Sequence, residues 1–454
     1  MHLNIIPRTL NSEQLERNNT RHNVLIIGID SLSRLSFIRQ LPKTYKFLKE
    51  TLNAYVFRGM TKIGDNTFPN LAAILTGKSA GYVSFFAEDL PDLNLFNYYR
   101  GGFRNAPTDH YMRPFWIAMQ TSRLYRFSSH LCFGRMPKHL LQIHYLKDFV
   151  SKYSNLAIPF FAFSFFVELS HDYINEVSLA DEDFHSLLKE LLLSGYLNRT
   201  YIFFLSDHGH RFDSLRETLI GRIEERMPFF AVTLPQDMNK SLLTLQNLRV
   251  NQGRLTSSYD VYFTLMDILS NSVNNTKLGY KTSSRGTTLF GPIFGNRTCQ
   301  TAGIPDHYCT CETEETISNE DPRAKEAATV LVNYINNFLD SHRNQCSLLS
   351  LSEIRRTDLI LPNQKTVADS RRQPNMTWRD ILLEYGKAKG IISKLRVIVK
   401  TVPGNALFEG TLQYREDDKS MTVLGDISRI NKYGSQSMCV KDAILRKYCY
   451  CLEN

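Results

Sequence analysis

Residues 201–211 read YIFFLSDHGHR, an apolar run that stops abruptly at Ser206, Asp207 and His208. Short runs rich in β-branched and aromatic residues that end in a glycine turn are typical of buried strands. In open α/β sheets, ligands bind just beyond the carboxyl ends of the strands, which is where Asp207 and His208 fall. A carboxylate beside an imidazole offers half of a coordination shell for Zn²⁺ or Mn²⁺. An isolated Asp-His pair is more often a loop whose Asp caps the next helix.

Two strands of the same kind precede this one. Residues 23–29 read NVLIIGI and lead into Asp30, and the apolar run at 157–169 leads into Ser170, His171 and Asp172. Helical patterns lie between the strands, at residues 140–153 and 181–193. The alternation predicts a mostly parallel sheet with helices on both faces, so the polar strand ends should meet at one edge.

Thr67 lies in the segment GDNTFPN at residues 64–70, which precedes the apolar run LAAILTGK. Pro69, just inside that run, is a strong signal for a helix start. Thr67 could simply be the N-cap of the helix. Its hydroxyl could instead be a nucleophile whose pKa a metal lowers, with the free N–H groups of the helix start stabilising an oxyanion.

The composition is that of a globular protein of 454 residues, 43% hydrophobic and 22% charged. We expect a polar tail over residues 1–20, a catalytic domain over 21–298 and a cysteine-rich region over 299–454. The last region should contain a helix at 321–340 and antiparallel strands at 394–402 and 406–414. The net charge of +9 suits anionic ligands such as phosphate esters, sulfated sugars or membrane head groups, although a solvated basic surface explains it equally well. We find no nucleic-acid motif.

The cysteines and the glycosylation motifs indicate a secretory route. Seven of the eight cysteines follow residue 298, which predicts disulfides in an oxidising compartment, with Cys132 the one most apart. The start of the chain has no apolar signal-peptide core, so a signal or anchor is not visible, and an intracellular protein stays open. The sequence has six N-glycosylation sequons, at Asn18, Asn198, Asn239, Asn274, Asn296 and Asn375.

The order of these segments resembles the alkaline phosphatase superfamily, which includes sulfatases, phosphodiesterases and phosphoglycerol or phosphoethanolamine transferases. The strongest resemblance is to the domain-of-unknown-function 229 family of animal sulfatase-like proteins, and it covers about residues 21–451. The motifs that carry it are PTDHYMRP at 107–114, LSHD at 169–172, SDHGHR at 206–211, RTCQTAGIPDHYCTC at 297–311, RINKYGSQSMC at 429–439 and KYCYC at 447–451.

This resemblance implies an alkaline-phosphatase-like α/β fold with a small cysteine-rich α+β region at the C-terminus. It also implies one divalent ion, Zn²⁺ or Mn²⁺, held by Asp30, Thr67, Asp207 and His208. Thr67 would be both ligand and nucleophile. Two-metal members carry a late histidine that has no suitable counterpart here, so one ion is favoured over two.

Two further residues follow from the same resemblance. His171 would be catalytic, touching the phosphoryl group of the substrate or binding a second ion. Arg211 would bind the substrate, because a guanidinium can contact a phosphate through two parallel hydrogen bonds.

Three functions follow as hypotheses. The first is a metal-dependent hydrolase or transferase acting on a phosphodiester, lipid head group or glycan phosphate through a threonine nucleophile. The second is a sulfatase-like hydrolase without formylglycine, since Thr67 stands where sulfatases carry cysteine or serine. The third is an extracellular pseudoenzyme that binds a partner. We expect an anionic phosphoester or glycan substrate, a location outside the cell or in the secretory lumen, and association with a membrane surface as a further option.

Overall fold

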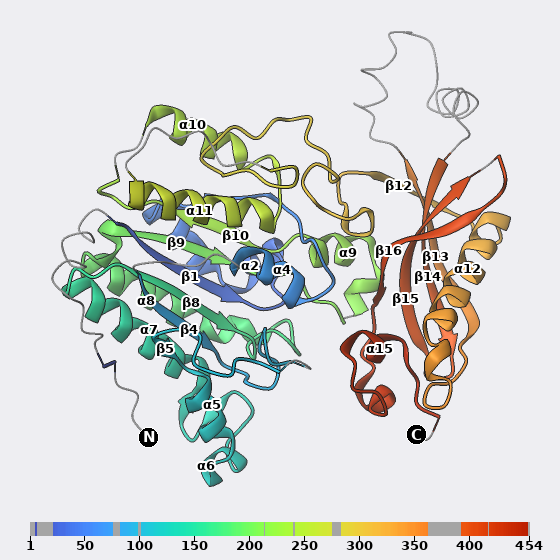
Figure 1. Ribbon diagram of the computed structural model, residues 1–454, viewed down its shortest axis with the longest axis horizontal. Helices are drawn as coiled ribbons and strands as arrows, with labels where there is room; N and C mark the ends of the chain where they lie inside the picture. The colour runs from blue at the N-terminus through green and yellow to red at the C-terminus, as the bar shows by residue number, and fades with distance from the viewer. Residues whose placement is uncertain are drawn as a thin grey trace. The chain divides into compact units, whose positions relative to one another are not determined.

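The computed structural model describes residues 5–6, 21–75, 82–98, 101–212, 214–238, 241–274, 283–361, 392–415 and 417–452. Most of the predicted polar tail at 1–20 therefore lies outside the described residues. The chain forms two compact units (Figure 1). The first consists of Met1–His210 and Leu219–Ile304, and the second of Arg211–Thr218 and Pro305–Asn454.

A seven-stranded sheet forms the centre of the first unit, in the order β2-β10-β9-β1-β8-β4-β5. The central strand β1 (Asn23–Ile29) is parallel to β8 (Phe160–Phe166) on one side and to β9 (Thr200–Leu205) on the other. Only β10 runs against its neighbours. The outer strands are β4 (Val83–Glu88), β5 (His110–Tyr111), β10 (Phe230–Thr233) and β2 (Tyr55–Val56). The predicted mostly parallel sheet is confirmed.

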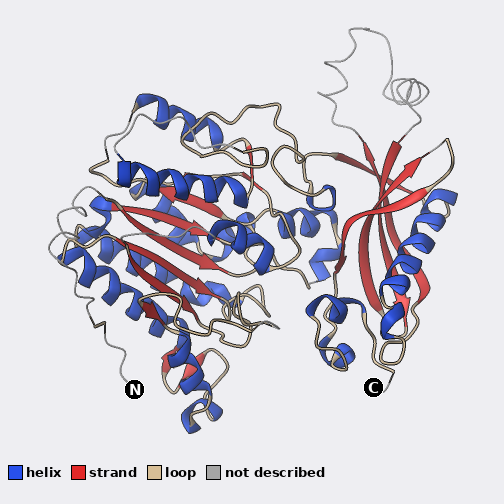
Figure 2. Ribbon diagram, in the orientation of Figure 1, coloured by secondary structure: helices blue, strands red, loops and turns tan. Residues whose placement is uncertain are grey.

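Helices cover both faces of this sheet (Figure 2). Alternate residues of β1 belong to different cores: Leu25 and Ile27 pack with helices α7 (Lys138–Asn155) and α8 (Asp181–Leu193), and Val24 and Ile26 pack in the core of α4 (Thr67–Leu75) and α11 (Ser258–Asn274). A strand buried on both faces requires an unbroken apolar run, which is the pattern that the sequence shows. Within the described ranges, no helix combines the length and hydropathy needed to cross a bilayer.

The remaining elements of the first unit are short. Residues 55–60 divide between the two short strands β2 and β3 (Gly59–Met60), because β3 pairs with a different partner, β11 (Leu255–Thr256). The others are α2 (Arg34–Gln40), α3 (Pro42–Lys46), α5 (Arg113–Gln120), α6 (Arg123–Arg126), β6 (Cys132–Phe133), β7 (Met136–Pro137), α9 (Leu219–Arg226) and α10 (Leu242–Asn251).

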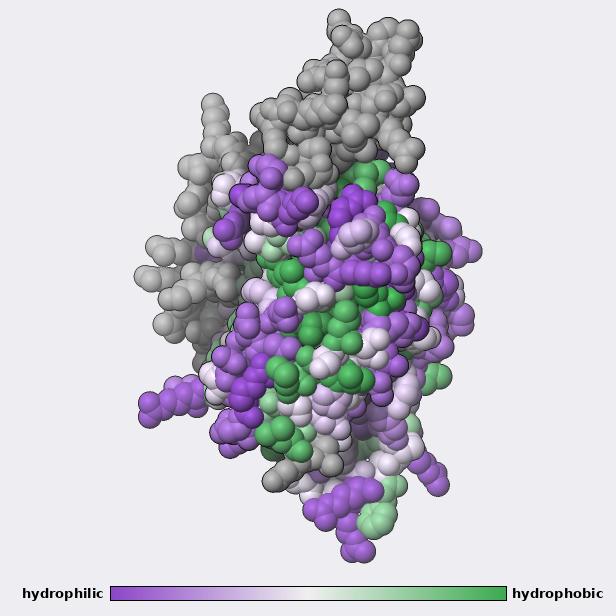
Figure 3. Space-filling model, turned by 90° about the vertical axis from the view of Figure 1, so that its right-hand side faces the viewer, coloured by the Kyte–Doolittle hydropathy of each residue, from purple (hydrophilic) through white to green (hydrophobic). Residues whose placement is uncertain are grey.

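The second unit is an antiparallel sheet in the order β12-β13-β14-β15-β16, covered by helix α12 (Pro322–Phe338). The predicted hairpin around Pro403 and Gly404 is present as β14 (Ile392–Val402) and β15 (Ala406–Arg415). On α12, Tyr334 and Phe338 are 48% and 44% exposed, and apolar residues run through the face of the molecule seen in Figure 3. The other strands are β12 (Thr313–Ile317), β13 (Ser350–Leu361) and β16 (Met421–Arg429).

Disulfides close the C-terminal region as the cysteine pattern predicted. Cys346 bonds to Cys449, and Cys439 to Cys451. Cys299 and Cys309 are disulfide-bonded as well. Cys132, expected to lie apart, has a free thiol, and so does Cys311.

Candidate metal and nucleophile site

Two parallel strands deliver the candidate metal ligands to the same edge of the sheet. Asp30 directly follows β1, and Asp207 and His208 follow β9. One potential ligand atom from each of these three buried residues lies within 4.8 Å of the others. His208 Nε2 is 3.1 Å from Asp207 Oδ2 and 3.9 Å from Asp30 Oδ1. The structure therefore brings together three of the four predicted ligands.

Hydrogen bonds fix the orientation of these side chains. The backbone N–H groups of Ser31 and His208 donate to Asp207 Oδ1 at 3.0 and 2.9 Å. His208 Nδ1 is 2.9 Å from the carbonyl of Gly209, and a carbonyl only accepts, so Nδ1 carries the proton. The lone pair of Nε2 then faces the carboxylates, as in imidazole ligands whose second nitrogen is hydrogen-bonded.

The chemistry of this cluster fits a divalent cation. Asp207 Oδ2 is buried and accepts no hydrogen bond from the described residues. Two buried carboxylates and an imidazole lone pair gathered this closely are electrostatically unfavourable. A bound cation would remove that penalty. The donor set of oxygens and one imidazole nitrogen is one that Zn²⁺ or Mn²⁺ accepts.

Gly209 allows the loop that carries Asp207 and His208 to lie directly against α9. Its N–H donates to the carbonyl of Glu225 at 2.8 Å. A Cβ at this position would lie 2.3 Å from the carbonyl oxygen of Glu224 and 2.7 Å from the Cα of Glu225. Only glycine fits so close to another backbone, so packing requires the glycine that follows Asp207 and His208.

Thr67 is the first residue of α4, at a helix start as predicted. The N-terminal cap comes from its neighbour, because Asn66 Oδ1 accepts the N–H of Phe68 at 3.2 Å. The Thr67 hydroxyl forms no hydrogen bond to another described residue. The cap that the structure shows is therefore Asn66, and the role of Thr67 as nucleophile stays a prediction.

Asn70 holds the turn before Thr67, a role that the sequence did not reveal. Its Oδ1 accepts the N–H groups of Ile63 and Gly64 at 2.8 and 3.1 Å, and its Nδ2 donates to the carbonyls of Gly64 and Asn66 at 3.0 and 2.8 Å. The side chain is fully buried. One amide thus satisfies four backbone groups and sets the position from which α4 begins.

A buried ion pair connects this turn to α9. Lys62 Nζ contacts the Glu225 carboxylate, and the Lys62 N–H donates to the carbonyl of Arg226 at 2.9 Å. The side chains of Lys62 and Glu225 are 0% and 2% exposed. Because the Glu225 carbonyl also accepts the N–H of Gly209, the segment that leads to Thr67 and the loop that carries His208 share one anchor.

Comparison with known families agrees with the predicted membership. A family model described as protein of unknown function (DUF229) matches residues 1–80 and 78–355. The chain belongs to the DUF229 family. The family predicted from the sequence motifs is confirmed. Among curated proteins, none matches this sequence.

Three solved structures similar to this DUF229 protein are distant from it. An alkaline phosphatase superfamily protein from Vibrio parahaemolyticus is 12% identical over 92% of both chains, with a TM-score of 0.37. Phosphonate monoester hydrolase of Agrobacterium radiobacter is 12% identical over 88% of this chain and 90% of its own, with a TM-score of 0.38. The lipoteichoic acid synthase LtaP from Listeria monocytogenes is 12% identical over 55% and 72%, with a TM-score of 0.36. Similarity this weak carries no argument about function, which has to come from the site.

The two remaining predicted residues of the DUF229 protein lie close in sequence to this site. His171 follows Ser170, whose hydroxyl donates to the carbonyl of Asp30, and the imidazole is 25% exposed. Arg211 opens the short segment that belongs to the second unit, and its guanidinium lies 4.8 Å from the centroid of the Phe212 ring. The roles of His171 and Arg211 toward a substrate stay predictions.

Acidic residues that the sequence did not single out lie at the carboxyl end of β4. Burial raises the pKa of Glu88 to about 8 and the pKa of Asp89 to about 7. Asp89 Oδ1 accepts the N–H of Val167 at 2.7 Å, so it braces the loop that follows β8. In the same loop, Glu168 is paired with the buried Lys138 at 2.6 Å. The signal in the sequence was the pair of acids directly after an apolar strand.

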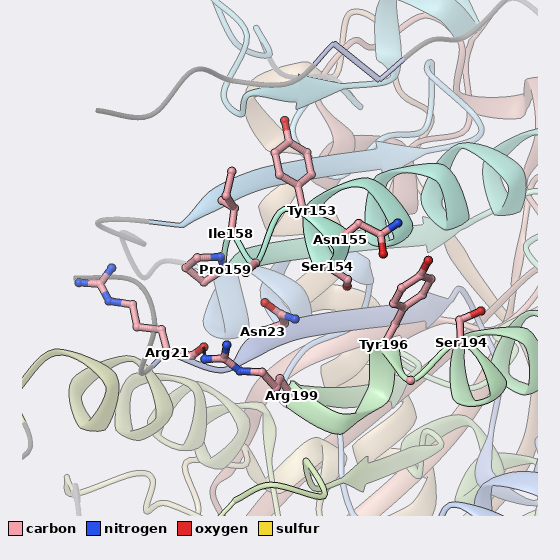
Figure 4. Close-up of a pocket in the computed structure, with 12 residues that line it drawn as sticks. Arg21, Asn23, Tyr153, Ser154, Asn155, Ile158, Pro159, Ser194, Tyr196 and Arg199 are labelled. Atoms are coloured by element: carbon pink, nitrogen blue, oxygen red, sulfur yellow. Dashed lines mark hydrogen bonds between the residues drawn. The ribbon is translucent and has the colours of Figure 1, made fainter. Parts of the chain in front are cut away.

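A cavity of about 310 Å³ lies at the opposite edge of the same sheet (Figure 4). Its lining includes Asn23 at the start of β1, Pro159 just before β8 and Arg199 just before β9. The strands begin there, whereas Asp30, Asp207 and His208 lie where the strands end. This cavity is therefore separate from the candidate site.

Proposed function

We propose that this DUF229 protein is a metal-dependent hydrolase or transferase that cleaves a phosphoester, with Thr67 as its nucleophile. The observation that carries the proposal is the buried cluster of Asp30, Asp207 and His208, whose loop shares the Lys62–Glu225 anchor with the turn before Thr67. The substrate class we propose is a phosphodiester, a lipid head group or a glycan phosphate.

One ion, Zn²⁺ or Mn²⁺, would be held by Asp30, Thr67, Asp207 and His208. Such an ion lowers the pKa of a coordinated hydroxyl and withdraws charge from phosphoryl oxygens. The positive end of the α4 dipole would stabilise negative charge on the same oxygens. His171 and Arg211 are the residues we propose to contact the phosphoryl group.

The reaction would proceed in two displacements. Thr67 Oγ1, having lost its proton, forms a bond to phosphorus, and the bond from phosphorus to the leaving oxygen breaks. The leaving oxygen takes up a proton and departs as an alcohol. Water, in hydrolysis, or a second alcohol, in transfer, then attacks phosphorus, gives up its proton and releases Thr67.

Two other functions use the same observations differently. Sulfate esters carry an anionic group of similar shape, but the usual sulfatase nucleophile, formylglycine, cannot be made from Thr67. A pseudoenzyme would keep the fold without turnover. A binding protein, however, has no need of a threonine hydroxyl at the helix start when the neighbouring Asn66 caps the helix. Disulfides persist in oxidising compartments, so we propose that the protein works outside the cell or in the secretory lumen.

The test compares Thr67→Ala, Thr67→Ser and Asp207→Asn on a panel of phosphomonoesters, phosphodiesters and sulfate esters. Thr67→Ala should lower turnover by orders of magnitude, because the covalent route is lost, and should weaken metal binding only modestly, because Asp30, Asp207 and His208 remain. Thr67→Ser keeps a hydroxyl and should retain measurable turnover. Asp207→Asn should remove metal and activity together, since a neutral amide is a poor ligand. Wild-type protein loaded with Zn²⁺ or Mn²⁺ that turns over none of these esters would contradict the proposal.

A further inference from the structure

A long stretch of one-sided charge follows strand β5. Residues 110–147 contain six lysine or arginine residues and no aspartate or glutamate. The stretch spans α5, α6, the β6–β7 hairpin and the first half of α7. We refer to residues 113–137, which hold four of the six basic residues, as the basic knob. Figure 1 shows α5 and α6 projecting from the β5 side of the sheet.

The knob is anchored on one side and apolar on the other. Trp116 and Met119 of α5 are 2% and 0% exposed and belong to the core. On the outer side, Phe127 is 80% exposed and Leu124 is 51% exposed. Leaving large apolar side chains in water is unfavourable, and their clustering on one element marks a surface for association.

Hydrogen bonds make the knob an ordered element that holds these side chains outward. Ser122 caps α6 by accepting the N–H of Tyr125 at 3.2 Å. The Ser128 hydroxyl donates to the carbonyl of Leu124 at 2.7 Å and accepts the N–H of Gly134 at 2.8 Å. Phe127 therefore lies in a braced turn between α6 and the hairpin.

The knob and the candidate metal site lie at the same edge of the sheet. β5 is parallel to β4 and, through it, to β8 and β1, and α5 begins just beyond the carboxyl end of β5. Lys138, directly after the knob, pairs with Glu168 at 2.6 Å in the loop that continues to His171. A surface that binds the knob would thus meet the edge at which the strands deliver Asp30 and Asp207.

We propose that the basic knob docks the protein onto an anionic lipid bilayer. The exposed side chains of Leu124 and Phe127 would enter the boundary between head groups and acyl chains, and the exposed Arg123, Arg126 and Arg135 would contact anionic head groups. The knob itself contains no acidic residue, so its own side chains do not repel a negative surface. Glu176 lies close to it, with Oε2 3.5 Å from His130 Nε2. Docking goes beyond the proposed catalytic function and does not depend on it.

The experiment measures co-flotation of the full chain with phosphatidylcholine vesicles that do or do not contain phosphatidylserine. Wild-type protein should bind the phosphatidylserine vesicles, and binding should weaken as salt is raised. Phe127→Ser with Leu124→Ser, and separately Arg123→Glu with Arg126→Glu, should each lower the partition coefficient by about tenfold or more.

Matched controls remove similar groups elsewhere on the first unit. Leu242→Ser with Leu243→Ser removes two leucines of α10 that are 85% and 55% exposed, and Lys189→Glu with Arg249→Glu reverses two exposed charges. Both controls should leave vesicle binding within about twofold of wild type. Screened electrostatic attraction and the burial of apolar side chains act only on residues close to the membrane surface. Circular dichroism and size exclusion confirm that all four variants keep the fold and the oligomeric state.

Three results would overturn the proposal. The wild-type protein could fail to float with phosphatidylserine vesicles. The knob variants could bind vesicles as tightly as the controls. In a parallel heparin-binding measurement, Arg123→Glu with Arg126→Glu could lose heparin binding while Phe127→Ser with Leu124→Ser keeps both heparin and vesicle binding. That result would assign the knob to a soluble anionic glycan.

Discussion

The ammonium of Lys62 and the carboxylate of Glu225 form a fully buried ion pair between the turn before Thr67 and helix α9. Glu225 also accepts the N–H of Gly209 through its carbonyl. The pair therefore fixes the distance between the candidate nucleophile segment and the loop of Asp207 and His208. A buried charge that loses its partner is strongly destabilising, which makes this contact testable.

Lys62→Met should destabilise the protein by about 3–5 kcal/mol, because the buried Glu225 carboxylate would lose the ammonium that contacts it. The double variant Lys62→Met with Glu225→Met should lose much less of the free energy of unfolding, since it removes both charges. Urea denaturation gives the free energies of unfolding. A single variant no less stable than the double variant would show that the pair does not act as an ion pair.

Asn70→Ala should cost about 2–4 kcal/mol, because four backbone groups around Gly64 lose their partner and the buried ones are left unsatisfied. Asn66→Ala is the matched control in the same turn. It removes only a helix cap, which is worth about 1 kcal/mol. Thermal unfolding of both variants measures the difference. Equal losses would mean that Asn70 does not organise the turn.

Glu88 should make the metal-free protein less stable as the pH rises. Its carboxyl has a pKa of about 8 in the folded protein and about 4.3 in an unfolded chain. Because the folded state holds the proton more tightly, this contribution is complete below about pH 4.3, declines as the pH rises and is lost above pH 8. Each pKa unit corresponds to about 1.4 kcal/mol.

Glu88→Gln should flatten that decline, because glutamine stays neutral and can still accept the N–H of Leu95. The measurement is urea denaturation between about pH 5 and pH 8 in the presence of a chelator, with wild type and variant in parallel. Parallel curves for the two proteins would contradict the assignment of the raised pKa to Glu88.

The two disulfides of the second unit should differ in their contribution. Cys346 and Cys449 are 103 residues apart and Cys439 and Cys451 are 12 apart. The loss of chain entropy in the unfolded state then predicts about 4.7 and about 2.8 kcal/mol. Cys346→Ala with Cys449→Ala should lower the melting temperature more than Cys439→Ala with Cys451→Ala. The reverse order would indicate that native contacts around the shorter loop outweigh the entropy term.

The sequence predicted best those parts of the fold in which burial alone decides which residues can occupy each position. A parallel strand buried on both faces needs an unbroken apolar run, and polar residues resume where the strand ends, so Asp30 and Asp207 were expected at the sheet edge. The hairpin around Pro403 was visible for a similar reason, because its strands are apolar on the covered face.

Other parts depend on partners far away in the chain. Lys62 sits in an unremarkable turn, and its partner Glu225 is 163 residues further on. Strand β13 reads SLSEIRRTDLIL with mostly exposed residues in its first half, so its pairing with β14 and β12 makes it a strand. The role of Asn70 likewise appears only in the folded turn, where its side-chain amide forms hydrogen bonds with the backbone of the preceding residues.

The segment Arg211–Thr218 belongs to the second unit, although it follows His210 directly and returns to the first unit at Leu219. Arg216 in this segment is 2% exposed, and its guanidinium pairs with the fully buried Glu409 of β15 at 3.1 Å. A fragment ending at residue 304 would leave that arginine without its carboxylate, three residues before α9 begins. Limited proteolysis or truncation should therefore fail to yield the first unit as a stable fragment, and recombinant work on this protein requires the chain to continue through its last strand.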